Sequence, residues 1–545
     1  MSEKNFIERP HQNEKQEALA YIKVLMDRAH KNDRLEDIPK LEKLAKLINS
    51  KRYGLVWEEH AELVEEEMET KLPVFVEIDE RKIHGNPDSS DYNFLLEGDN
   101  LHSLHLLEKT HTGKIDVIYI DPPYNTGNKD FIYNDKIVDK TDGYSHSKWL
   151  SFMSKRLEIA QRLLSDEGVI FISIDDNEQA QLKLLCDEVF GEGNFRNSFI
   201  VRRRNKSLNV QFANKGLKTL NVGCETILCY AKKNFLFNPV RMKKKNFSEK
   251  GKWNVFWSNA DRPTMRYEIL GFKPESGQWR WSEEIASIAA KNYQEYIEKF
   301  SDKESLEEYW ERTGKKKRFL RRIKNGKGKN GGVQSWVSPS STTLRTSNWT
   351  DLEVSQIFKL ANIEFSNPKN IDLINLIISC SPKKDATILD FFAGSGTTGH
   401  AVAQLNKEDG GNRKYILCTN NENKIAEEVT YQRLSKIQDE LPHNLKYFKT
   451  DFIEKDNDDL EFTLLDHVKT LIELEHGIDL QESDKATAFN LEAVRTLDLE
   501  GVKTVYMRQQ SHAMMEIKDL ERYKYITIID VPDYYFANEM KEAGL

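Results

Sequence analysis

Residues 386–407 read ATILDFFAGSGTTGHAVAQLNK. The apolar run ATIL predicts a buried strand, the glycines after it predict a tight turn, and GHAVAQLNK predicts a helix. A second apolar run, KYILCT (414–419), predicts the next strand, and Glu422 follows it where a Rossmann-type fold places an acidic residue for a ribose hydroxyl. Strand, glycine turn, helix, strand and acid together predict the nucleoside-binding half of a doubly wound α/β sheet.

The glycine turn has two other interpretations. A lone glycine pattern is a weak signal, and it also fits a close-packed turn that holds no ligand. Gly394 and Gly399 have the spacing of a nucleotide phosphate loop, but the residues that follow are His400 and Ala401. Because the phosphate-binding lysine of that loop is missing, an NTPase is disfavoured.

The other half of the sheet is predicted between about residues 92 and 178. The runs IDVIYI (115–120) and GVIFISI (168–174) are typical of buried parallel strands, and WLSFMSKRLEIAQRLL (149–164) is typical of an amphipathic helix between them. TILCYAK (226–232) is a further strand candidate. The pattern therefore predicts a Rossmann-like α/β fold whose two halves are separated in sequence.

The tetrapeptide Asp121-Pro122-Pro123-Tyr124 directly follows IDVIYI. Ligands of doubly wound sheets bind beyond the carboxyl ends of the strands, and this tetrapeptide lies at such an end. The Asp121 carboxylate and the Pro122 carbonyl offer two acceptors that the prolines hold in place, and Tyr124 offers an aromatic face. This set suits a planar aromatic amine, such as that of adenine, and needs no metal. As a short motif it also fits a simple strand-ending turn.

Composition indicates a multidomain protein without a membrane span. The chain has 545 residues, 39% hydrophobic and 31% charged, and it contains no run of about 18 apolar residues. The polar N-terminus lacks an export signal, so we expect a cytoplasmic protein. The five scattered cysteines predict neither disulfides nor a metal site, and we expect all five to be buried.

Charge is distributed unevenly along the chain, whose net charge is −8. From residue 201 to 333 there are 31 Lys and Arg against 14 Asp and Glu, a net charge of +17, and seven of the nine tryptophans lie between residues 201 and 349. A single basic cluster is often a solvated helix face. The whole segment, with basic and aromatic residues interleaved, favours double-stranded DNA as a partner.

Six motifs make the chain resemble the β-class amino-methyltransferases, and most closely the modification (Mod) subunits of type III restriction-modification systems. The matching segments, between about residues 92 and 437, are LLEGDNLHSL, IYIDPPYNTGNKDFIYND, GVIFISIDDNE, ETILCYAK, IEFSNPKNIDLI and ILDFFAGSGTT. The tetrapeptide precedes the glycine motif and a basic segment separates them, which is the order of that class. The long N-terminal extension and the C-terminal segment depart from the family pattern.

The resemblance implies a function and a set of site residues. It implies methyl transfer from S-adenosylmethionine to the N6 amine of a flipped adenine in DNA, with catalysis by Asp121, Pro122, Pro123 and Tyr124. The cofactor-binding residues it implies are Asp99, Phe365, Pro368, Lys369, Asp390, Phe392, Gly394, Gly396, Thr397 and Glu422, with no metal. It also implies a homodimer that works with a separate ATP-dependent restriction (Res) subunit.

Other functions remain open from the sequence. One is an orphan DNA methyltransferase without a restriction partner. Others are an RNA or protein amino-methyltransferase, in which the glycine motif generally comes first, and a catalytically silent DNA-binding subunit.

The predicted organisation has five segments: a helical N-terminal extension (1–75), the catalytic half of the methyltransferase domain (76–235), an inserted target-recognition domain (236–350), the cofactor-binding half (351–450) and a C-terminal accessory or dimerisation domain (451–545).

Overall fold

The computed structural model describes residues 14–31, 34, 37–49, 57–127, 130–134, 136–139, 141–203, 220, 222–244, 246–355 and 368–544. The chain divides into two compact units. The larger unit combines residues 1–238 with 347–545, and the smaller unit is Pro239–Thr346.

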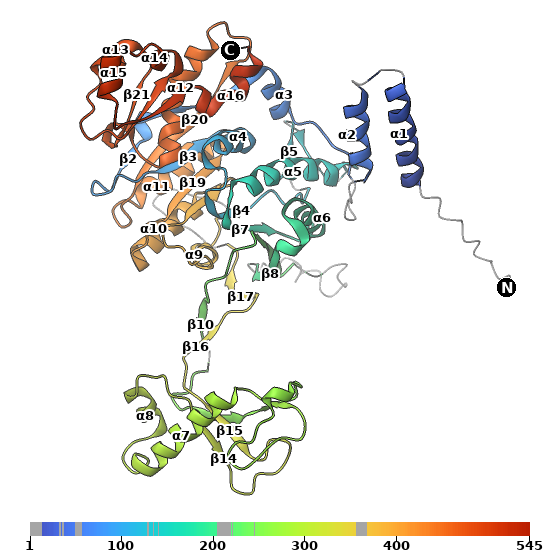
Figure 1. Ribbon diagram of the computed structural model, residues 1–545, viewed down its shortest axis with the longest axis vertical. Coiled ribbons are helices and arrows are strands. Elements are labelled where there is room, and N and C mark those ends of the chain that lie inside the picture. Colours follow the sequence, from blue (N-terminus) through green and yellow to red (C-terminus); the bar gives the residue numbers. More distant parts are fainter. Residues whose placement is uncertain are drawn as a thin grey trace, which may run out of the picture. The chain divides into compact units, whose positions relative to one another are not determined.

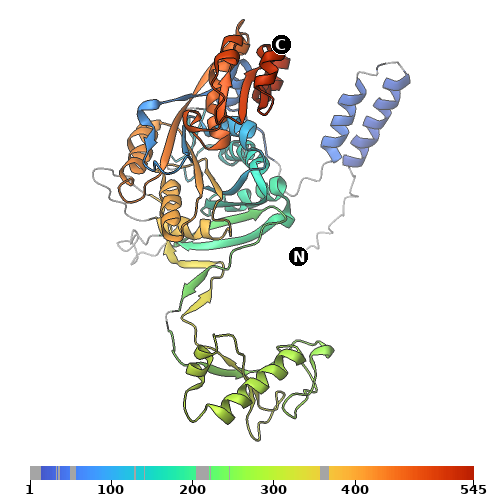
Figure 2. The ribbon, with the colours of Figure 1, turned by 60° about the vertical axis from the view of Figure 1, so that its left-hand side comes forward.

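An 11-stranded mixed sheet forms the centre of the larger unit (Figures 1 and 2). Its strands, in spatial order, are β1 (Lys71–Glu77), β20 (Asn444–Glu454), β3 (Asn93–Glu97), β19 (Lys414–Thr419), β18 (Thr387–Asp390), β4 (Ile115–Ile120), β7 (Leu164–Ile174), β9 (Cys224–Ala231), β8 (Phe195–Arg202) and β17 (Asn348–Glu353), and β2 (Ile83–His84) pairs with β20. The strands from β20 to β7 are parallel, whereas β9 runs antiparallel to both β7 and β8.

The predicted strands and the predicted fold class are confirmed. IDVIYI forms β4 and KYILCT forms β19 with the predicted bounds. The run GVIFISI lies in β7, and all but one residue of ATIL and of TILCYAK lie in β18 and β9. β4 and β18 are neighbours, with Val117 opposite Ile388 and Ile118 opposite Leu389. The two half-folds, separated by more than 200 residues in sequence, therefore form one sheet.

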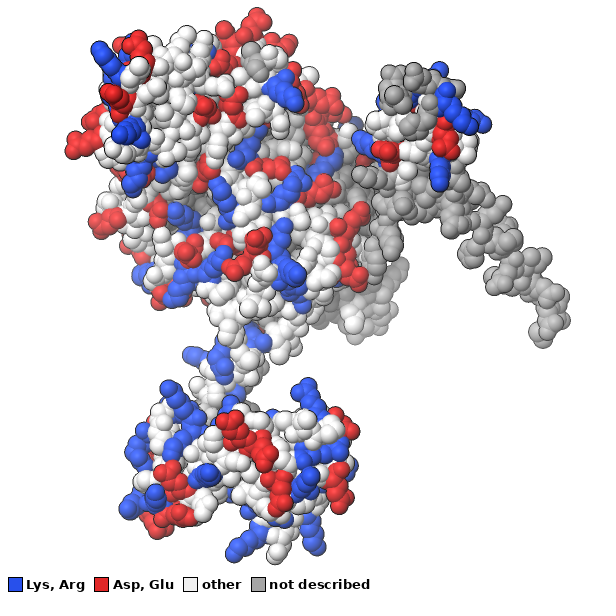
Figure 3. All heavy atoms as spheres, viewed as in Figure 1, with Lys and Arg blue, Asp and Glu red and all other residues white. Residues whose placement is uncertain are grey.

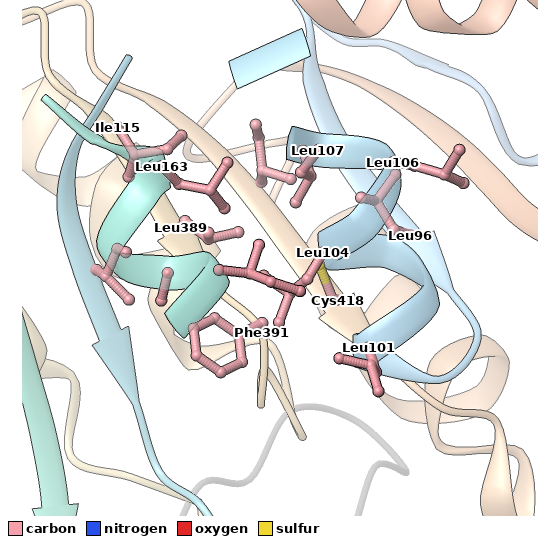
Figure 4. Close-up of a cluster of buried hydrophobic side chains, with 14 of the residues drawn as sticks. Leu96, Leu101, Leu104, Leu106, Leu107, Ile115, Leu163, Leu389, Phe391 and Cys418 are labelled. Carbon is pink, nitrogen blue, oxygen red and sulfur yellow. The ribbon is translucent and has the colours of Figure 1, made fainter. Parts of the chain in front are cut away.

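Helices cover both faces of this sheet. They are α3 (Leu63–Thr70), α4 (Asn100–His111), α5 (Ser145–Leu163), α6 (Gln179–Cys186), α9 (Ile371–Ser379), α10 (Thr397–Asp409), α11 (Gln432–Lys436) and α12 (Leu460–His476). On one face, Leu104 and Leu107 of α4 and Leu163 of α5 pack with strand residues in the main core (Figure 4). The helices α9 and α10 pack against each other and contribute no residue to that cluster.

Two of the predicted domain boundaries fall inside strands of the sheet. The boundary at 75/76 lies within β1 and the boundary at 450/451 lies within β20, and these two strands pair with each other, Phe75 opposite Thr450. α12 packs on β1. The predicted N-terminal extension therefore supplies most of β1, and the predicted C-terminal segment supplies the last four residues of β20, so both segments take part in the sheet.

The C-terminal residues after α12 form a small parallel sheet. Its strands are β21 (Lys485–Ala488), β22 (Thr504–Arg508) and β23 (Thr527–Val531), accompanied by α13 (Leu491–Thr496), α14 (Gln509–Ala513), α15 (Ile517–Arg522) and α16 (Asp533–Glu542). Near the other end of the chain, α1 (Glu14–Lys31) and α2 (Ile38–Asn49) pack against each other as an antiparallel pair (Figure 1).

The smaller unit has its own aromatic core. It contains α7 (Glu283–Lys299), α8 (Leu306–Arg312) and the strands β10 (Arg241–Lys243), β11 (Lys252–Val255), β12 (Trp257–Ser258), β13 (Gln278–Trp279), β14 (Leu320–Arg322), β15 (Val333–Val337) and β16 (Thr342–Leu344). Trp279 is fully buried and stacks on Phe256. Trp279 and Trp336 are therefore part of the hydrophobic core of this unit.

No helix among the described residues is long and apolar enough to cross a membrane. The described residues contain no cluster of His, Cys, Asp or Glu that could hold a metal ion. Four cysteines are buried as predicted, but Cys224 is exposed, because it begins β9 at the edge of the folded core.

Candidate active site

The ends of β4 and β18 bring the two sequence motifs together. The strands are parallel neighbours, so the tetrapeptide after β4 and the glycine turn after β18 emerge at the same edge of the sheet. A cavity of about 560 Å³ lies there, and Asp121, Pro123, Phe392 and Gly394 line it. Phe391 and Cys418 join the cavity to the core shown in Figure 4.

The cavity is acidic. Six carboxylate residues line it: Glu62, Glu67, Asp99, Asp121, Asp130 and Glu422. Within the part of the chain that the structure describes, no Lys or Arg lines it. S-adenosylmethionine, which carries a sulfonium and an ammonium group and is net positive, fits both this charge and a volume typical of small-molecule sites.

The glycine turn is held by a buried carboxylate. Asp390 is 3% exposed; its Oδ1 accepts a hydrogen bond from the Phe392 amide at 3.1 Å, and its Oδ2 accepts one from the Thr398 hydroxyl at 2.5 Å. Burial raises the pKa of Asp390 to about 7, against the effect of these two hydrogen bonds. Asp390 therefore supports the turn from behind and does not line the cavity.

The two glycines have left-handed backbones. Gly394 has φ of 50° and lines the cavity, and Gly396 has φ of 71° as the residue before α10. A Cβ atom on Gly396 would lie 3.0 Å from Thr430 Cγ2. Thr397, the first residue of α10, is buried, and its hydroxyl accepts a hydrogen bond from the Arg433 guanidinium at 2.8 Å.

The tetrapeptide is fixed by a buried tryptophan and a lysine. The Trp149 indole donates a hydrogen bond to the Pro123 carbonyl at 2.7 Å. Lys369 Nζ lies 2.8 Å from Asp121 Oδ1 and donates a hydrogen bond to Tyr124 Oη at 2.9 Å. Burial and the nearby carboxylates of Asp121 and Glu225 raise the pKa of Tyr124 well above its ordinary value, so its hydroxyl stays protonated.

The remaining cofactor candidates occupy different places. Glu422, just after β19, lines the cavity, as does Asp99, the residue before α4, whose carboxylate lies 3.3 Å from the Arg156 guanidinium. Pro368 is buried and Lys369 lies against the tetrapeptide, and neither lines the cavity. Phe365 lies outside the described residues.

Three charged residues of the site are not among those that the sequence predicts: Glu62, Arg156 and Glu225. Arg156 of α5 is fully buried and pairs with Glu62 at 2.9 Å, so the segment before α3 forms one wall of the cavity. Glu225, at the start of β9, accepts a hydrogen bond from Tyr124 Oη at 3.0 Å. Glu225 lies here because β9 runs antiparallel to β7, which brings the first residues of β9 to the edge where the parallel strands end.

Comparison with known proteins identifies the family. The family model described as DNA methylase, N6_N4_Mtase, matches residues 115–430. The chain is 33% identical over 425 residues to the type II methyltransferase M.KpnI of Klebsiella pneumoniae, covering 68% of this chain and 93% of that protein.

Two type III proteins are also similar. The StyLTI Mod subunit of Salmonella typhimurium is 33% identical over 391 residues, covering 65% of this chain and 57% of that subunit. The EcoPI Mod subunit of Escherichia phage P1 is 29% identical over 438 residues, covering 69% and 64%. This chain thus spans nearly all of the type II relative and about three fifths of these Mod subunits. It belongs to the N6_N4_Mtase family of DNA methylases and is a DNA methyltransferase whose cofactor is S-adenosylmethionine.

Proposed function

We propose that the chain methylates the N6 amine of adenine at a specific sequence in double-stranded DNA, as the modification and recognition subunit of a type III restriction-modification system. One observation carries the proposal. Asp121 and Pro123 line the same cavity as Gly394 and Glu422. An acceptor for the target amine and a site for a cationic cofactor therefore adjoin each other.

The tetrapeptide acts on the target amine. Bound S-adenosylmethionine supplies an electrophilic methyl group. The Asp121 carboxylate and the Pro122 carbonyl accept hydrogen bonds from the two amine N–H groups, which makes the nitrogen lone pair available, and Asp121 takes up the proton that the amine loses. Because this amine is buried in duplex DNA, the base is flipped out and stacks on Tyr124.

The residues around the glycine turn divide into two groups. Asp99, Phe392, Gly394 and Glu422, which line the cavity, contact the cofactor. A second set holds the turn in place from behind: Asp390, Gly396 and Thr397.

The choice of adenine and of a type III system rests on residue type and on relatives. The tetrapeptide begins with Asp, whereas related cytosine-N4 enzymes usually have Ser there. Two of the similar proteins are type III Mod subunits, which supports a separate Res partner. The resemblance to that class also implies a homodimer. The second candidate is an orphan DNA methyltransferase without a restriction partner. The alignment with a type II methyltransferase, which covers 93% of that protein and 68% of this chain, supports a system other than type III.

The smaller unit is proposed as the target-recognition domain. Pro239–Thr346 contains 24 Lys and Arg against 13 Asp and Glu, a net charge of +11, within a chain of net charge −8. Figure 3 shows its Lys and Arg side chains spread over the viewed face, with acidic side chains between them. Positive charge of this kind neutralises phosphates and releases counterions.

Sequencing of modified bases tests the proposed activity. DNA from a methylation-free host expressing the chain is compared with DNA from the same host expressing Asp121→Ala. N6-methyladenine at one short motif, absent with the variant, is the expected result. No modified base in either sample, or a methylated cytosine, would contradict the proposal.

Two measurements test the partners. The affinity for duplex DNA should fall steeply with salt, and Lys324→Gln with Lys327→Gln should reduce the slope of log K against log salt by about 1 for each lost phosphate contact. Lys503→Gln, an exposed lysine outside the smaller unit, is the control.

Light scattering of the purified chain should give the mass of a dimer.

A further inference from the structure

Lys369 lies between three oxygen atoms of the active site. Its Nζ is 2.8 Å from Asp121 Oδ1, 2.9 Å from Tyr124 Oη and 3.5 Å from Glu225 Oε2. Its side chain is only 13% exposed. The Tyr124 hydroxyl also bridges the two carboxylates, at 2.7 Å from Asp121 Oδ1 and 3.0 Å from Glu225 Oε2. The four side chains thus form one closed network beside the cavity.

Glu225 is itself held on its other oxygen. The Arg203 guanidinium, just after β8, lies 3.0 Å from Glu225 Oε1 and 3.7 Å from Asp175, just after β7. The Glu225 side chain is 6% exposed. Main-chain pairing of β9 with both β7 and β8 fixes its Cα position. Glu225 is therefore a rigid anchor for Lys369 and Tyr124.

The network uses one oxygen of Asp121. Lys369 and Tyr124 both contact Oδ1. Among the described residues, no hydrogen bond is found on Oδ2, although Asp121 is 30% exposed and lines the cavity. A carboxylate can rotate about its Cβ–Cγ bond, and two contacts on Oδ1 restrict this rotation. Oδ2 is thereby the oxygen left for a ligand.

Lys369 stays charged in this position. Burial opposes its charge, but the carboxylates of Asp121 and Glu225 outweigh burial and raise the pKa of Lys369 above its ordinary value. A buried ion pair contributes little net stability, because desolvation offsets the attraction, whereas removing one partner leaves an uncompensated charge. Such a network is better explained by the geometry that it imposes on Asp121 than by a gain in stability.

We propose that Glu225 and Lys369 are positioning residues for methyl transfer: they hold Asp121 Oδ1 and the Tyr124 hydroxyl so that Asp121 Oδ2 accepts the hydrogen bond from the target amine. The inference rests on the proposed role of Asp121 as that acceptor. It assigns Lys369 to the catalytic part of the site, whereas the family resemblance implies that Lys369 binds the cofactor.

Steady-state kinetics of the full chain test the proposal, with Glu225→Gln and Lys369→Met as variants. A misplaced acceptor costs about 100-fold in rate, so kcat should fall about 100-fold for each variant. The Kd for S-adenosylmethionine and the KM for DNA should change less than threefold. Lys369→Arg, which keeps the charge, should recover part of the lost kcat. Glu225→Gln is nearly isosteric and keeps one acceptor oxygen for Tyr124, so it tests the role even where Lys369→Met folds poorly.

Lys383→Met is the matched control. Lys383 pairs with Asp116 at 2.8 Å, which places the same type of ion pair at the opposite end of the same strand, β4. This variant should keep the wild-type kcat. A loss of kcat in the control equal to that of Lys369→Met would show a general effect of breaking ion pairs on the sheet and would overturn the proposal.

A double variant separates positioning from stability. If Lys369 acts through Asp121, Asp121→Ala with Lys369→Met should be no slower than Asp121→Ala alone, whereas independent structural effects would add. A wild-type kcat in Glu225→Gln and Lys369→Met, with a strongly reduced kcat in Asp121→Ala, would overturn this inference alone. A wild-type kcat in Asp121→Ala would instead overturn the proposed function on which the inference rests.

Discussion

Two neighbouring strands of the sheet lead into an aspartate at the same edge, and the two aspartates have different environments. Asp121 follows β4, is 30% exposed and lines the cavity beside a lysine. Asp390 ends β18, is 3% exposed and accepts hydrogen bonds from a backbone amide and a hydroxyl. One carboxylate is presented to a ligand, and the other shapes the turn that would receive one.

The difference shows that the surroundings of a carboxylate at a strand end determine whether it can bind a ligand or only stabilises its own turn. A cationic side chain and an open cavity keep Asp121 available for exchange of hydrogen bonds. Burial against neutral donors raises the pKa of Asp390 to about 7 and confines its contacts to its own turn. We therefore expect substitutions at the Asp121 end to change kcat, and substitutions at the Asp390 end to change cofactor affinity and stability.

The largest expected effect is that of Asp121→Ala. Loss of a preorganised polar group in an active site costs roughly 10²- to 10³-fold in kcat, and we expect the upper end because the proposed mechanism also assigns the released proton to Asp121. The Kd for S-adenosylmethionine, measured by calorimetry, should stay within threefold. Asp390→Asn is the counterpart, in which kcat at saturating cofactor should stay within tenfold. A larger loss of kcat in Asp390→Asn than in Asp121→Ala would contradict the roles assigned to the two aspartates.

Gly396→Ala should weaken cofactor binding about tenfold. An alanine in the left-handed region costs about 1–2 kcal/mol, and its Cβ would also press on Thr430. Gly410→Ala is a matched control, because Gly410 has φ of 67° at the other end of α10 with no atom within 4 Å of its added Cβ. Calorimetry and melting temperature should show lost stability in both variants but lost affinity only in Gly396→Ala. Equal affinities would show that the turn does not shape the cofactor site.

Local sequence patterns are sufficient to predict the parallel strands at the centre of the sheet and the positions of the two motifs. The runs that form β4 and β19 are short, apolar and bounded by polar or turn residues, so type and bounds could both be predicted. The motifs follow these strands directly, and parallel strands end at a common edge. Asp121, Phe392, Gly394 and Glu422 therefore line one cavity.

Long-range pairing determined what the sequence could not indicate. β1 and β20 are far apart in the chain and contain charged residues, so nothing local marks them as partners. Glu225 lies at the site because β9 is antiparallel to β7, a direction that a strand pattern does not contain. The family motif implies a cofactor-binding role for Lys369, but a motif locates a residue along the chain and leaves the direction of its side chain open. In the structure this side chain contacts Asp121 and Tyr124.

The pH dependence of stability should distinguish the two aspartates further. The folded chain keeps a proton on Asp390 up to about pH 7, whereas the unfolded chain loses it near pH 4. Asp390 therefore favours folding below pH 4, and this contribution is lost as the pH rises to about 7. The melting temperature of the wild type, relative to Asp390→Asn, should decline between pH 5 and pH 8. A constant difference over that range would show that Asp390 is already ionised in the folded chain.

Thr398→Val should have the smallest effect and probes the Asp390 end most selectively. The Thr398 hydroxyl is buried and donates to Asp390 Oδ2, and losing such a hydrogen bond costs about 1 kcal/mol. The hydroxyl also lowers the pKa of Asp390, so its removal should shift the pH window of stability upward. A drop of a few degrees in melting temperature with unchanged kcat is expected. A tenfold fall in kcat would mean that the turn after β18 takes part in the transfer step, and the division of roles between the two strand ends would then fail.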